Sequence, residues 1–165
     1  MFFEKIQAKI KTRATAKEAV KQWQAAGGKV VFTNGCFDLL HLGHIHYLAQ
    51  AKDMGTHLII GVNSDQSVSQ LKGPQRPIKD EQTRLHLLAA LACVAAVVLF
   101  EEETPLELIE NLLPDVLVKG GDWALDSIVG ADIVLANGGT VHSLPFVEGF
   151  STTNYVEKIK GESIK

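Results

Sequence analysis

Two histidines flank a glycine in the segment His41-Leu42-Gly43-His44, which lies between a β-rich run ending at Thr33 and a helical pattern. At a turn from a strand into a helix, the free N–H groups and the partial positive charge of the helix N-terminus favour a bound phosphate. Imidazole donors placed there would stabilise the charge that develops on phosphate oxygens during phosphoryl or nucleotidyl transfer. Gly35 allows a tight turn, and Gly43 leaves space for a bulky anion beside the backbone. We therefore predict a phosphate-binding catalytic turn.

A metal site is the main alternative, because Asp38, His41 and His44 have a spacing that zinc could use. A glycine-rich turn is unnecessary in a zinc hydrolase, however, and the sequence contains no second cluster of cysteine and histidine to complete the ligand shell. We therefore expect no metal ion held by protein ligands alone. The zinc alternative predicts stoichiometric zinc and an activity that chelation removes without any involvement of ATP.

A basic loop, LKGPQRP, follows the second predicted strand and carries Lys72 and Arg76. Its glycine and prolines mark a stiff connector. A lysine suits a triphosphate as a mobile point charge, and the planar guanidinium of an arginine can fork onto a sugar phosphate. Arg84, in the next predicted helix, is a further candidate for a phosphate contact. The alternative for these residues is a solvated basic surface.

Two more segments stand where a ligand of an α/β sheet would lie. Lys119-Gly120-Gly121-Asp122 follows the fourth predicted strand, and its glycines allow a planar base or ribose to lie against the backbone. Asp122 can accept a hydrogen bond from a ribose hydroxyl or a base amino group. Ser151-Thr152-Thr153 opens the last predicted helix, where hydroxyls and free N–H groups suit a triphosphate. An ordinary glycine turn and an ordinary helix cap are the alternatives.

The elements that position these segments alternate between helix and strand. Apolar strands that are nearly continuous, separated by helices, predict a parallel sheet covered on both faces, with ligands beyond the carboxyl ends of the strands. We expect helices over residues 4–26, 42–54 and 81–91, a helix opening at Thr104-Pro105 and a last one over 151–160, and strands over 29–33, 57–62, 94–100, 116–118 and, more briefly, 133–135 and 141–144.

Composition limits the class of protein. A chain of 165 residues with 46% hydrophobic content suits one compact domain, which we divide into an N-terminal helical segment (1–28) and a main domain (29–165). The net charge of −3 gives no general attraction to nucleic acid or to an anionic membrane. Two cysteines form no disulfide framework, and the N-terminal stretch lacks the pattern of a secretory signal. We therefore expect a cytoplasmic protein without nucleic-acid or membrane partners.

The run NGCFDLLHLGH resembles the HxGH signature of the cytidylyltransferase-like nucleotidyltransferases. The segments VNSDQSVSQLKGPQRP, LVKGGDW and EGFSTTNYV are similar to the family in order and spacing. The resemblance implies a Rossmann-like three-layer αβα sandwich with a mostly parallel central sheet. Within the family, the chain looks most like the free-standing bacterial heptose 1-phosphate adenylyltransferases. These transfer AMP from ATP to D-glycero-β-D-manno-heptose 1-phosphate and release pyrophosphate, giving ADP-heptose for the lipopolysaccharide inner core.

The resemblance also implies roles for particular residues, with Mg²⁺ bound mainly through the ATP phosphates and a homodimer as the assembly. Catalysis would rest on His41, His44 and Lys72. The acceptor would contact Asn34, Asp38, Arg76 and Arg84. The nucleotide would contact Gly35, Cys36, Phe37, His41, Gly43, His44, Lys119, Gly120, Asp122, Ser151, Thr152 and Thr153.

Two alternatives of different kinds stay open. One is a cytidylyltransferase acting on glycerol 3-phosphate or a related small phosphate. Those enzymes usually carry an arginine shortly before their EG-x-STT segment, where this chain has Phe146. The loss of that donor weakens the cytidylyl alternative but does not by itself establish adenylyl transfer. The other is a nucleotide-binding sensor without turnover, and the complete set of His41, His44, Lys72 and Ser151-Thr152-Thr153 argues against it.

Overall fold

Six parallel strands form one sheet in the computed structural model, which describes residues 1–145, 147 and 149–161. The strand order is β1-β4-β3-β2-β5-β6, and every neighbouring pair is parallel. The expected α/β class with a parallel central sheet is confirmed. The strands are β1 (Ile10–Lys11), β2 (Val30–Gly35), β3 (His57–Asn63), β4 (Ala96–Phe100), β5 (Val116–Gly120) and β6 (Thr140–Leu144).

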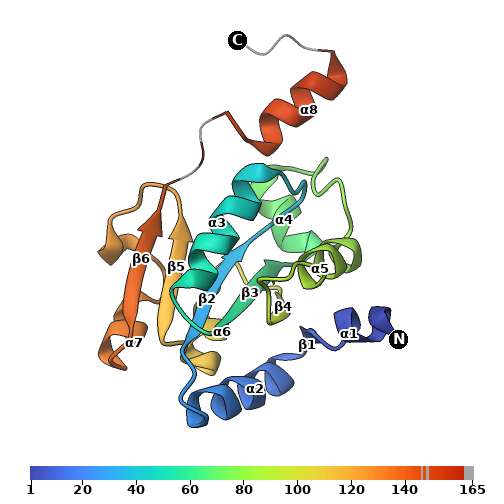
Figure 1. Cartoon of the computed structure of the whole chain (residues 1–165). Helices are drawn as coiled ribbons and strands as arrows, with labels where there is room; N and C mark the ends of the chain where they lie inside the picture. Colours follow the sequence, from blue (N-terminus) through green and yellow to red (C-terminus); the bar gives the residue numbers. More distant parts are fainter. Residues whose placement is uncertain (146, 148, 162–165) are drawn as a thin grey trace.

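Helices lie against both faces of this sheet, which gives the three layers (Figure 1). Helices α2, α6 and α7 pack on one face, and α3 and α5 pack on the other. None of the helices in the described part of the chain has the length and apolar character needed to cross a membrane. The helices are α1 (Phe2–Gln7), α2 (Arg13–Ala25), α3 (Leu42–Asp53), α4 (Asp65–Lys72), α5 (Glu81–Ala89), α6 (Leu106–Leu112), the short 3₁₀ helix η1 (Leu125–Ser127), α7 (Ala131–Ala136) and α8 (Thr152–Lys160).

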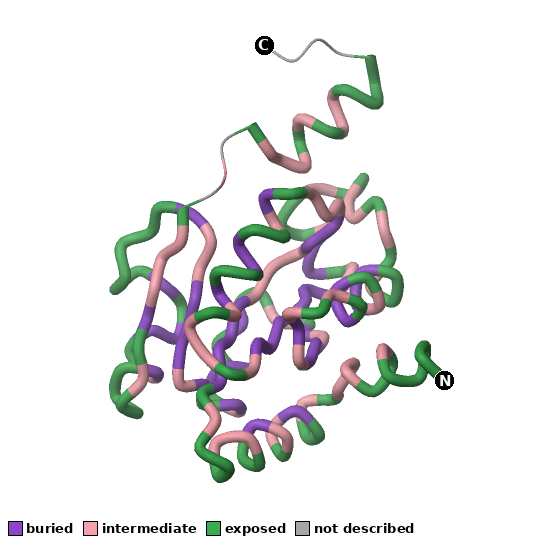
Figure 2. Tube along the Cα trace, in the orientation of Figure 1, coloured by how far each residue is buried: buried purple, intermediate pink, exposed green. Residues whose placement is uncertain are grey.

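The two core layers draw on alternate residues of the same strands. In β2, Val30 and Phe32 face the layer of α2, α6 and α7, whereas Val31 faces α3 and α5. Successive side chains of a strand point to opposite faces, so a strand buried on both sides must be apolar throughout. Figure 2 shows the buried backbone concentrated along the central strands. Each such side chain contributes ~1.5–3 kcal/mol on burial, which holds the strand ends in place.

The single N-terminal helix expected over residues 4–26 is wrong in its middle, where β1 divides it into α1 and α2. Ile10 pairs with Val97 of β4, and the Val97 N–H donates to the Lys9 carbonyl at 2.9 Å. The Thr12 side chain then caps α2. Pairing with a strand that is distant in the sequence therefore overrides the local helix propensity.

Two other expectations change. Residues 133–135, expected as a strand, lie inside α7, because so short an apolar run does not distinguish a buried helix from a strand. Residues 65–72 form α4, so the basic loop begins at Gly73, two residues later than its sequence suggested. The strand expected over 141–144 is confirmed as part of β6.

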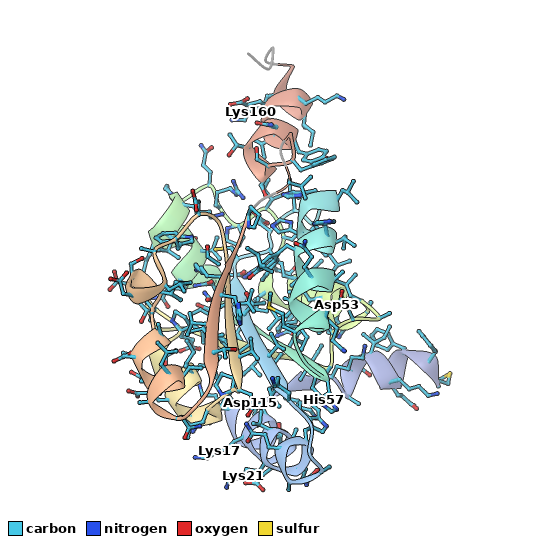
Figure 3. All side chains as sticks on the ribbon, turned by 60° about the vertical axis from the view of Figure 1, so that its left-hand side comes forward. Lys17, Lys21, Asp53, His57, Asp115 and Lys160 are labelled. Atoms are coloured by element: carbon cyan, nitrogen blue, oxygen red, sulfur yellow. The ribbon has the colours of Figure 1, made fainter. Side chains whose placement is uncertain are left out.

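The two ends of the sheet have different surroundings. The carboxyl ends of the strands face α8, which stands away from the other helices and has no buried residue (Figure 1). His57 and Asp115 lie at the opposite end, far from Lys160 of α8 (Figure 3). There the Val30 N–H donates to the Asp115 carboxylate at 2.7 Å, a structural contact at the start of β2. A ligand site is therefore expected at the end of the sheet near α8.

Candidate active site

The carboxyl ends of β2 and β5 lie side by side where the strand order of the sheet reverses. Open α/β sheets leave a ligand-binding crevice at such a switch point. Asn34 and Gly35 end β2, and Lys119 and Gly120 end β5. A pocket of about 410 Å³ lies over these strand ends. It is lined by Asn34, Gly35, Cys36, Phe37, Asp38, His44, Tyr47, Lys72, Lys119, Gly120, Trp123 and Thr152.

A second pocket of about 280 Å³ adjoins the first. The two share the lining residues Asn34, Gly35, Cys36, Lys119 and Trp123, so together they form one continuous depression. The second pocket is the more enclosed by aliphatic side chains. Its remaining lining residues are Asn63, Leu71, Glu103, Thr104, Pro105, Leu117, Ser127, Ile128 and Val129.

His44 lines the first pocket and stacks on His41, with ring centroids 3.8 Å apart and ring planes 26° apart. His41 itself lines neither pocket and stands behind His44. His41 is the N-cap of α3, and its carbonyl accepts from the His44 N–H at 3.0 Å. Burial lowers the pKa of His44 to about 4, and the positive charges of His41 and Lys72 add to the effect. Burial also lowers the pKa of His41. Both rings are therefore neutral at pH 7, and within the described residues no group hydrogen-bonds to either buried Nδ1.

Gly43 lies between the two histidines and is itself buried. A Cβ atom at this position would lie 3.0 Å from His41 Nδ1 and 3.2 Å from Phe150 Cβ. Both contacts are tighter than ordinary packing. The glycine therefore makes room for a protein ring and for the segment before α8, where the sequence suggested room for an anion.

The turn after β2 is held by the Phe37 ring. Phe37 has a positive φ of 48°, and a Cβ atom on Gly35 would lie only 2.9 Å from its Cε2. The same ring meets His44 edge to face, with centroids 5.3 Å apart. A side chain on Gly35 would displace Phe37, so the glycine allows the close approach that supports His44.

Asp38 is buried and fastens the loop after α4 to this turn. It accepts from Arg76 Nε at 2.7 Å and from the backbone N–H groups of Ile78 and Lys79 at 2.9 Å each. Burial alone would raise the pKa of Asp38, but these donors outweigh it and hold the pKa below its usual value. Both carboxylate oxygens are engaged, so Asp38 holds Arg76 and the loop in position. Asp38 also lines the first pocket, and its contact with the acceptor stays a prediction.

The predicted phosphate contact of Arg84 gains no support from the pockets. Its side chain is fully buried, with Nε donating to the Lys79 carbonyl, Nη1 to the Cys36 carbonyl and Nη2 to Asp65 Oδ1. It lines neither pocket, so it joins the two loops of the site without facing a ligand. Arg76 also lines neither pocket. It stays a candidate for the acceptor because its buried Nη2 finds no partner among the described residues.

The two predicted lysines face the first pocket from opposite sides. Lys72 is the last residue of α4 and is exposed, as a mobile charge at a pocket rim should be. Lys119 is the second-last residue of β5, and its Nζ lies 6.0 Å from the centre of the Trp123 ring. Burial lowers the pKa of Lys119, with the nearby Cys36 acting in the opposite direction. The pocket thus brings two cationic side chains to the histidine pair.

The segment around α8 meets the predictions in part. Thr152 lines the first pocket, whereas Ser151 caps α8 by accepting from the Asn154 N–H at 3.1 Å, and Thr153 is exposed. Asp122 is also exposed and lines neither pocket, so its predicted nucleotide contact gains no support. Phe146, which separated the adenylyl and cytidylyl alternatives, lies outside the described residues.

The zinc alternative finds no ligand set in the described part of the chain. No group of three His, Cys, Asp or Glu side chains gathers there in a way that could hold a metal ion. The carboxylate proposed for that shell, Asp38, is occupied by Arg76 and two backbone donors. The arrangement instead offers neutral imidazoles, two lysines and backbone N–H groups, which suit phosphate oxygens.

This combination of fold and site has relatives. A family model described as cytidylyltransferase-like matches residues 32–158, which include the end of β2, the histidine pair, the basic loop and most of α8. The chain belongs to the cytidylyltransferase-like family. The family resemblance seen in the sequence is therefore confirmed.

Two curated relatives are both called bifunctional protein HldE. The chain is 55% identical over 152 residues to that of Trichlorobacter lovleyi, covering 92% of this chain and 31% of the relative. It is 52% identical over 158 residues to that of Geotalea uraniireducens, covering 96% and 32%. The chain thus spans about a third of the length of these relatives.

Two solved structures share the architecture. A lipopolysaccharide core biosynthesis protein from Thermoplasma volcanium has a TM-score of 0.58 at 32% identity, over 73% of this chain and 98% of that chain. A bifunctional NMN adenylyltransferase/ADP ribose pyrophosphatase from Francisella tularensis has a TM-score of 0.54 at 17% identity, over 84% and 43%. The expected Rossmann-like nucleotidyltransferase fold is confirmed.

Several pocket residues escaped the sequence prediction, among them Tyr47, Asn63 and Trp123. Tyr47 lies three residues after His44, so its position on the same face of the helix is the one available signal. Asn63 ends β3 in the predicted motif VNSD but carried no assigned role. Trp123 follows Asp122 in a loop whose course depends on the tertiary structure.

Proposed function

We propose that this protein transfers AMP from ATP to D-glycero-β-D-manno-heptose 1-phosphate, giving ADP-heptose and pyrophosphate. The observation that carries the proposal is the stacked, neutral pair of His41 and His44 beside Lys72 and Lys119, at the carboxyl ends of β2 and β5. A neutral imidazole can donate its N–H to a phosphate oxygen, although it carries no positive charge of its own. The lysines would balance the remaining charge of a triphosphate.

The two connected pockets suggest how ATP would lie. The second pocket, with Leu117, Ile128 and Val129 in its wall, suits a flat base. The first pocket, with His44, Lys72 and the backbone of Gly120, suits the phosphates. The α-phosphate would then lie beside the histidine pair, near the junction of the two pockets.

The reaction requires one bond exchange at the α-phosphorus. An oxygen of the sugar phosphate forms a new P–O bond to it while the bond to the bridging oxygen of pyrophosphate breaks, and pyrophosphate leaves with that electron pair. The attacking phosphate is already ionised at neutral pH, so no strong general base is required. His41 and His44 would donate to the α-phosphate oxygens, and Arg76 would orient the acceptor, which leaves positioning and charge stabilisation as the work of the protein.

Mg²⁺ is proposed to enter as part of the ATP complex. The described residues offer no cluster of carboxylates that would form a protein cage. This agrees with the preference of Mg²⁺ for substrate phosphates and water over a dedicated set of protein ligands. It would neutralise phosphate charge, and the residues named above would hold the nucleotide.

The choice of acceptor rests on the relatives. The proteins named HldE match over almost the whole chain at more than half identity, and a solved relative is named for lipopolysaccharide core biosynthesis. Because the chain spans about a third of the HldE proteins, the adenylyl transfer and the heptose substrate are transferred to it as a proposal. We likewise propose that the protein acts in the cytoplasm.

A screen of pyrophosphate release tests this function. ATP and CTP are each combined with D-glycero-β-D-manno-heptose 1-phosphate and with glycerol 3-phosphate, and the nucleotide product is identified by mass spectrometry. We expect release with ATP and the heptose phosphate only. Release with CTP and glycerol 3-phosphate would instead support a cytidylyltransferase, and ATP binding by calorimetry without turnover of either acceptor would support a sensor.

We also propose a homodimer. The support is an apolar surface on α1, where Phe2 and Phe3 are exposed and Phe3 and Ile6 line a groove with Leu87 of α5. Sedimentation equilibrium of the protein and of a Phe2→Ser/Phe3→Ser variant tests this. A monomeric wild-type protein would contradict the proposal, and a dimer unaffected by the substitutions would place the interface elsewhere.

A further inference from the structure

Strands β2 and β5 separate just below the candidate active site. Their pairing ends at Phe32 and Leu117, whereas β2 continues to pair with β3 up to Gly35 and β5 with β6 up to Gly120. The last three residues of each strand therefore lack a partner strand on the side of the crevice. Asn34 and Lys119, which line both pockets, lie in these separated portions.

The Tyr47 hydroxyl occupies the point of separation. It contacts the Thr33 hydroxyl of β2 and donates to the Val118 carbonyl of β5 at 3.3 Å. A carbonyl only accepts, so the Thr33 hydroxyl donates to the phenolic oxygen and the phenol donates to Val118. One side chain thus replaces the backbone ladder at the first step where the two strands no longer pair.

The hydrogen bonds that join Thr33, Tyr47 and Val118, called the Tyr47 tie below, are shielded from water. Tyr47 and Thr33 are both buried, so water competes little for their hydroxyl groups. Burial raises the pKa of Tyr47 to about 12, which keeps the phenol protonated and able to donate across the whole neutral range. The ring lines the first pocket, directly beneath the proposed place of the phosphates.

The tie also reaches the histidines. Tyr47 lies on α3 three residues after His44, so both stand on the same face of that helix. Thr33 immediately precedes Asn34 in β2, and Val118 immediately precedes Lys119 in β5. The hydroxyl therefore joins the helix that carries the histidine pair to both strands that carry the facing site residues.

We propose that Tyr47 is a positioning residue for nucleotidyl transfer, whose hydroxyl sets the separation between the His41/His44 pair and the Lys119 side of the crevice. This inference rests on the proposed function. Loss of the hydroxyl leaves the ring in place but removes the connection between α3, β2 and β5. The separated ends of β2 and β5 then move more freely, and the phosphate donors no longer stand at a fixed distance.

The test compares Tyr47→Phe, Thr33→Val and Thr33→Ser with the wild-type protein. Tyr47→Phe and Thr33→Val each remove one hydroxyl at nearly constant shape, whereas Thr33→Ser retains it. We expect the first two to lower kcat roughly tenfold, the scale of one buried hydrogen bond, with a smaller change in the KM for ATP. Thr33→Ser should restore most of the rate, and the double variant should lose little more than either single variant, because the two hydroxyls act as a unit.

A matched control separates positioning from general loss of stability. Ile109→Val lies in the opposite core layer, on α6, and removes one methylene group there. Urea unfolding measures the stability lost by each variant, and hydrogen exchange of the amides of residues 118–121 reports on the strand end directly. Faster exchange there in Tyr47→Phe, with none in Ile109→Val, supports the tie.

The outcomes distinguish the two proposals. A wild-type protein that releases no pyrophosphate from any substrate pair contradicts the proposed function. An active wild type with an unchanged kcat in Tyr47→Phe contradicts the role of Tyr47 alone. The role of Tyr47 is also contradicted if Ile109→Val loses as much kcat per kcal/mol of lost stability as Tyr47→Phe does. It is contradicted as well if Tyr47→Phe leaves the hydrogen-exchange rates of residues 118–121 unchanged.

Discussion

The imidazole rings of His41 and His44 stack with their centroids 3.8 Å apart. At this distance two protonated rings would repel each other strongly. Burial lowers the pKa of both rings and keeps them neutral at pH 7, and the proximity of His41 adds to the effect at His44. The pair therefore offers N–H donors of low charge to a strongly anionic ligand. Its effectiveness depends on fixed geometry, which Phe37, Gly43 and Phe150 supply by packing around the rings.

Replacement of either histidine should reduce the rate far more than binding. We expect His41→Ala or His44→Ala to lower kcat by at least about 100-fold, the usual cost of losing a placed transition-state donor. The affinity for ATP, measured by calorimetry, should change less. His46→Ala is the matched control, since His46 is exposed on the same helix. A near-wild-type kcat in either site variant would sink the proposed mechanism.

The lowered pKa of His44 makes stability depend on pH. The folded-state pKa of about 4 lies below the ordinary value of 6.5, so between these values the unfolded chain binds more protons. The contribution is complete above pH 6.5 and is lost as the pH falls toward 4. Allowing for partial exposure, we expect the free energy of unfolding to drop by about 1 kcal/mol between pH 6.5 and 5.

Urea unfolding of wild type and His44→Gln over this pH range measures that effect. Carboxyl groups titrate similarly in both proteins, so the difference between the two curves isolates His44. The difference should grow in favour of the wild type as the pH rises from 4 to 6.5 and then stay constant. Parallel curves throughout the range would contradict the burial of a neutral His44.

The tight packing around Gly43 predicts a sensitive position. In Gly43→Ala, the new methyl group meets His41 Nδ1 at 3.0 Å and Phe150 Cβ at 3.2 Å unless these groups shift. We expect a stability loss of about 1–3 kcal/mol from overpacking and a loss of rate from the displaced ring. Leu42→Ala, at an exposed neighbouring position, is the control. Thermal unfolding measures the loss of stability, and kcat measures the effect of the displaced His41 ring. A Gly43→Ala variant with wild-type kcat would contradict the prediction.

The buried carboxylate of Asp38 should matter for the acceptor more than for ATP. Asp38→Asn weakens the anchor of Arg76, Ile78 and Lys79, which we expect to cost about 2–4 kcal/mol of stability. The KM for the sugar phosphate should rise more than the KM for ATP, because Arg76 loses its fixed orientation. Asp53→Asn, exposed at the end of α3, should change neither value. If Asp38→Asn is destabilised but its KM for the sugar phosphate is unchanged, Arg76 does not contact the acceptor.

Much of the fold could be predicted from local sequence patterns. The apolar strands, the helix starts and the glycine turns are properties of short stretches, so the parallel sheet and the helix beginning at Leu42 could be predicted from them. The strand β1 could not, because Ile10 becomes a strand only through pairing with Val97, which is far away in the sequence. Residues 133–135 were misassigned because three apolar residues fit a buried helix or a strand equally well.

The amino-acid sequence by itself determined that a histidine pair would stand at a strand-to-helix turn with basic residues nearby. That follows from residue types and spacing, which fix the local course of the chain. Only the tertiary structure decided which charged residues face the pocket and which hold its walls. Asp38 and Arg84 look like ligands in the sequence, yet they are buried among protein partners, whereas Tyr47 carries no motif and joins three elements. Burial and hydrogen bonding between distant segments assign these roles, and neither is a property of a short stretch of chain.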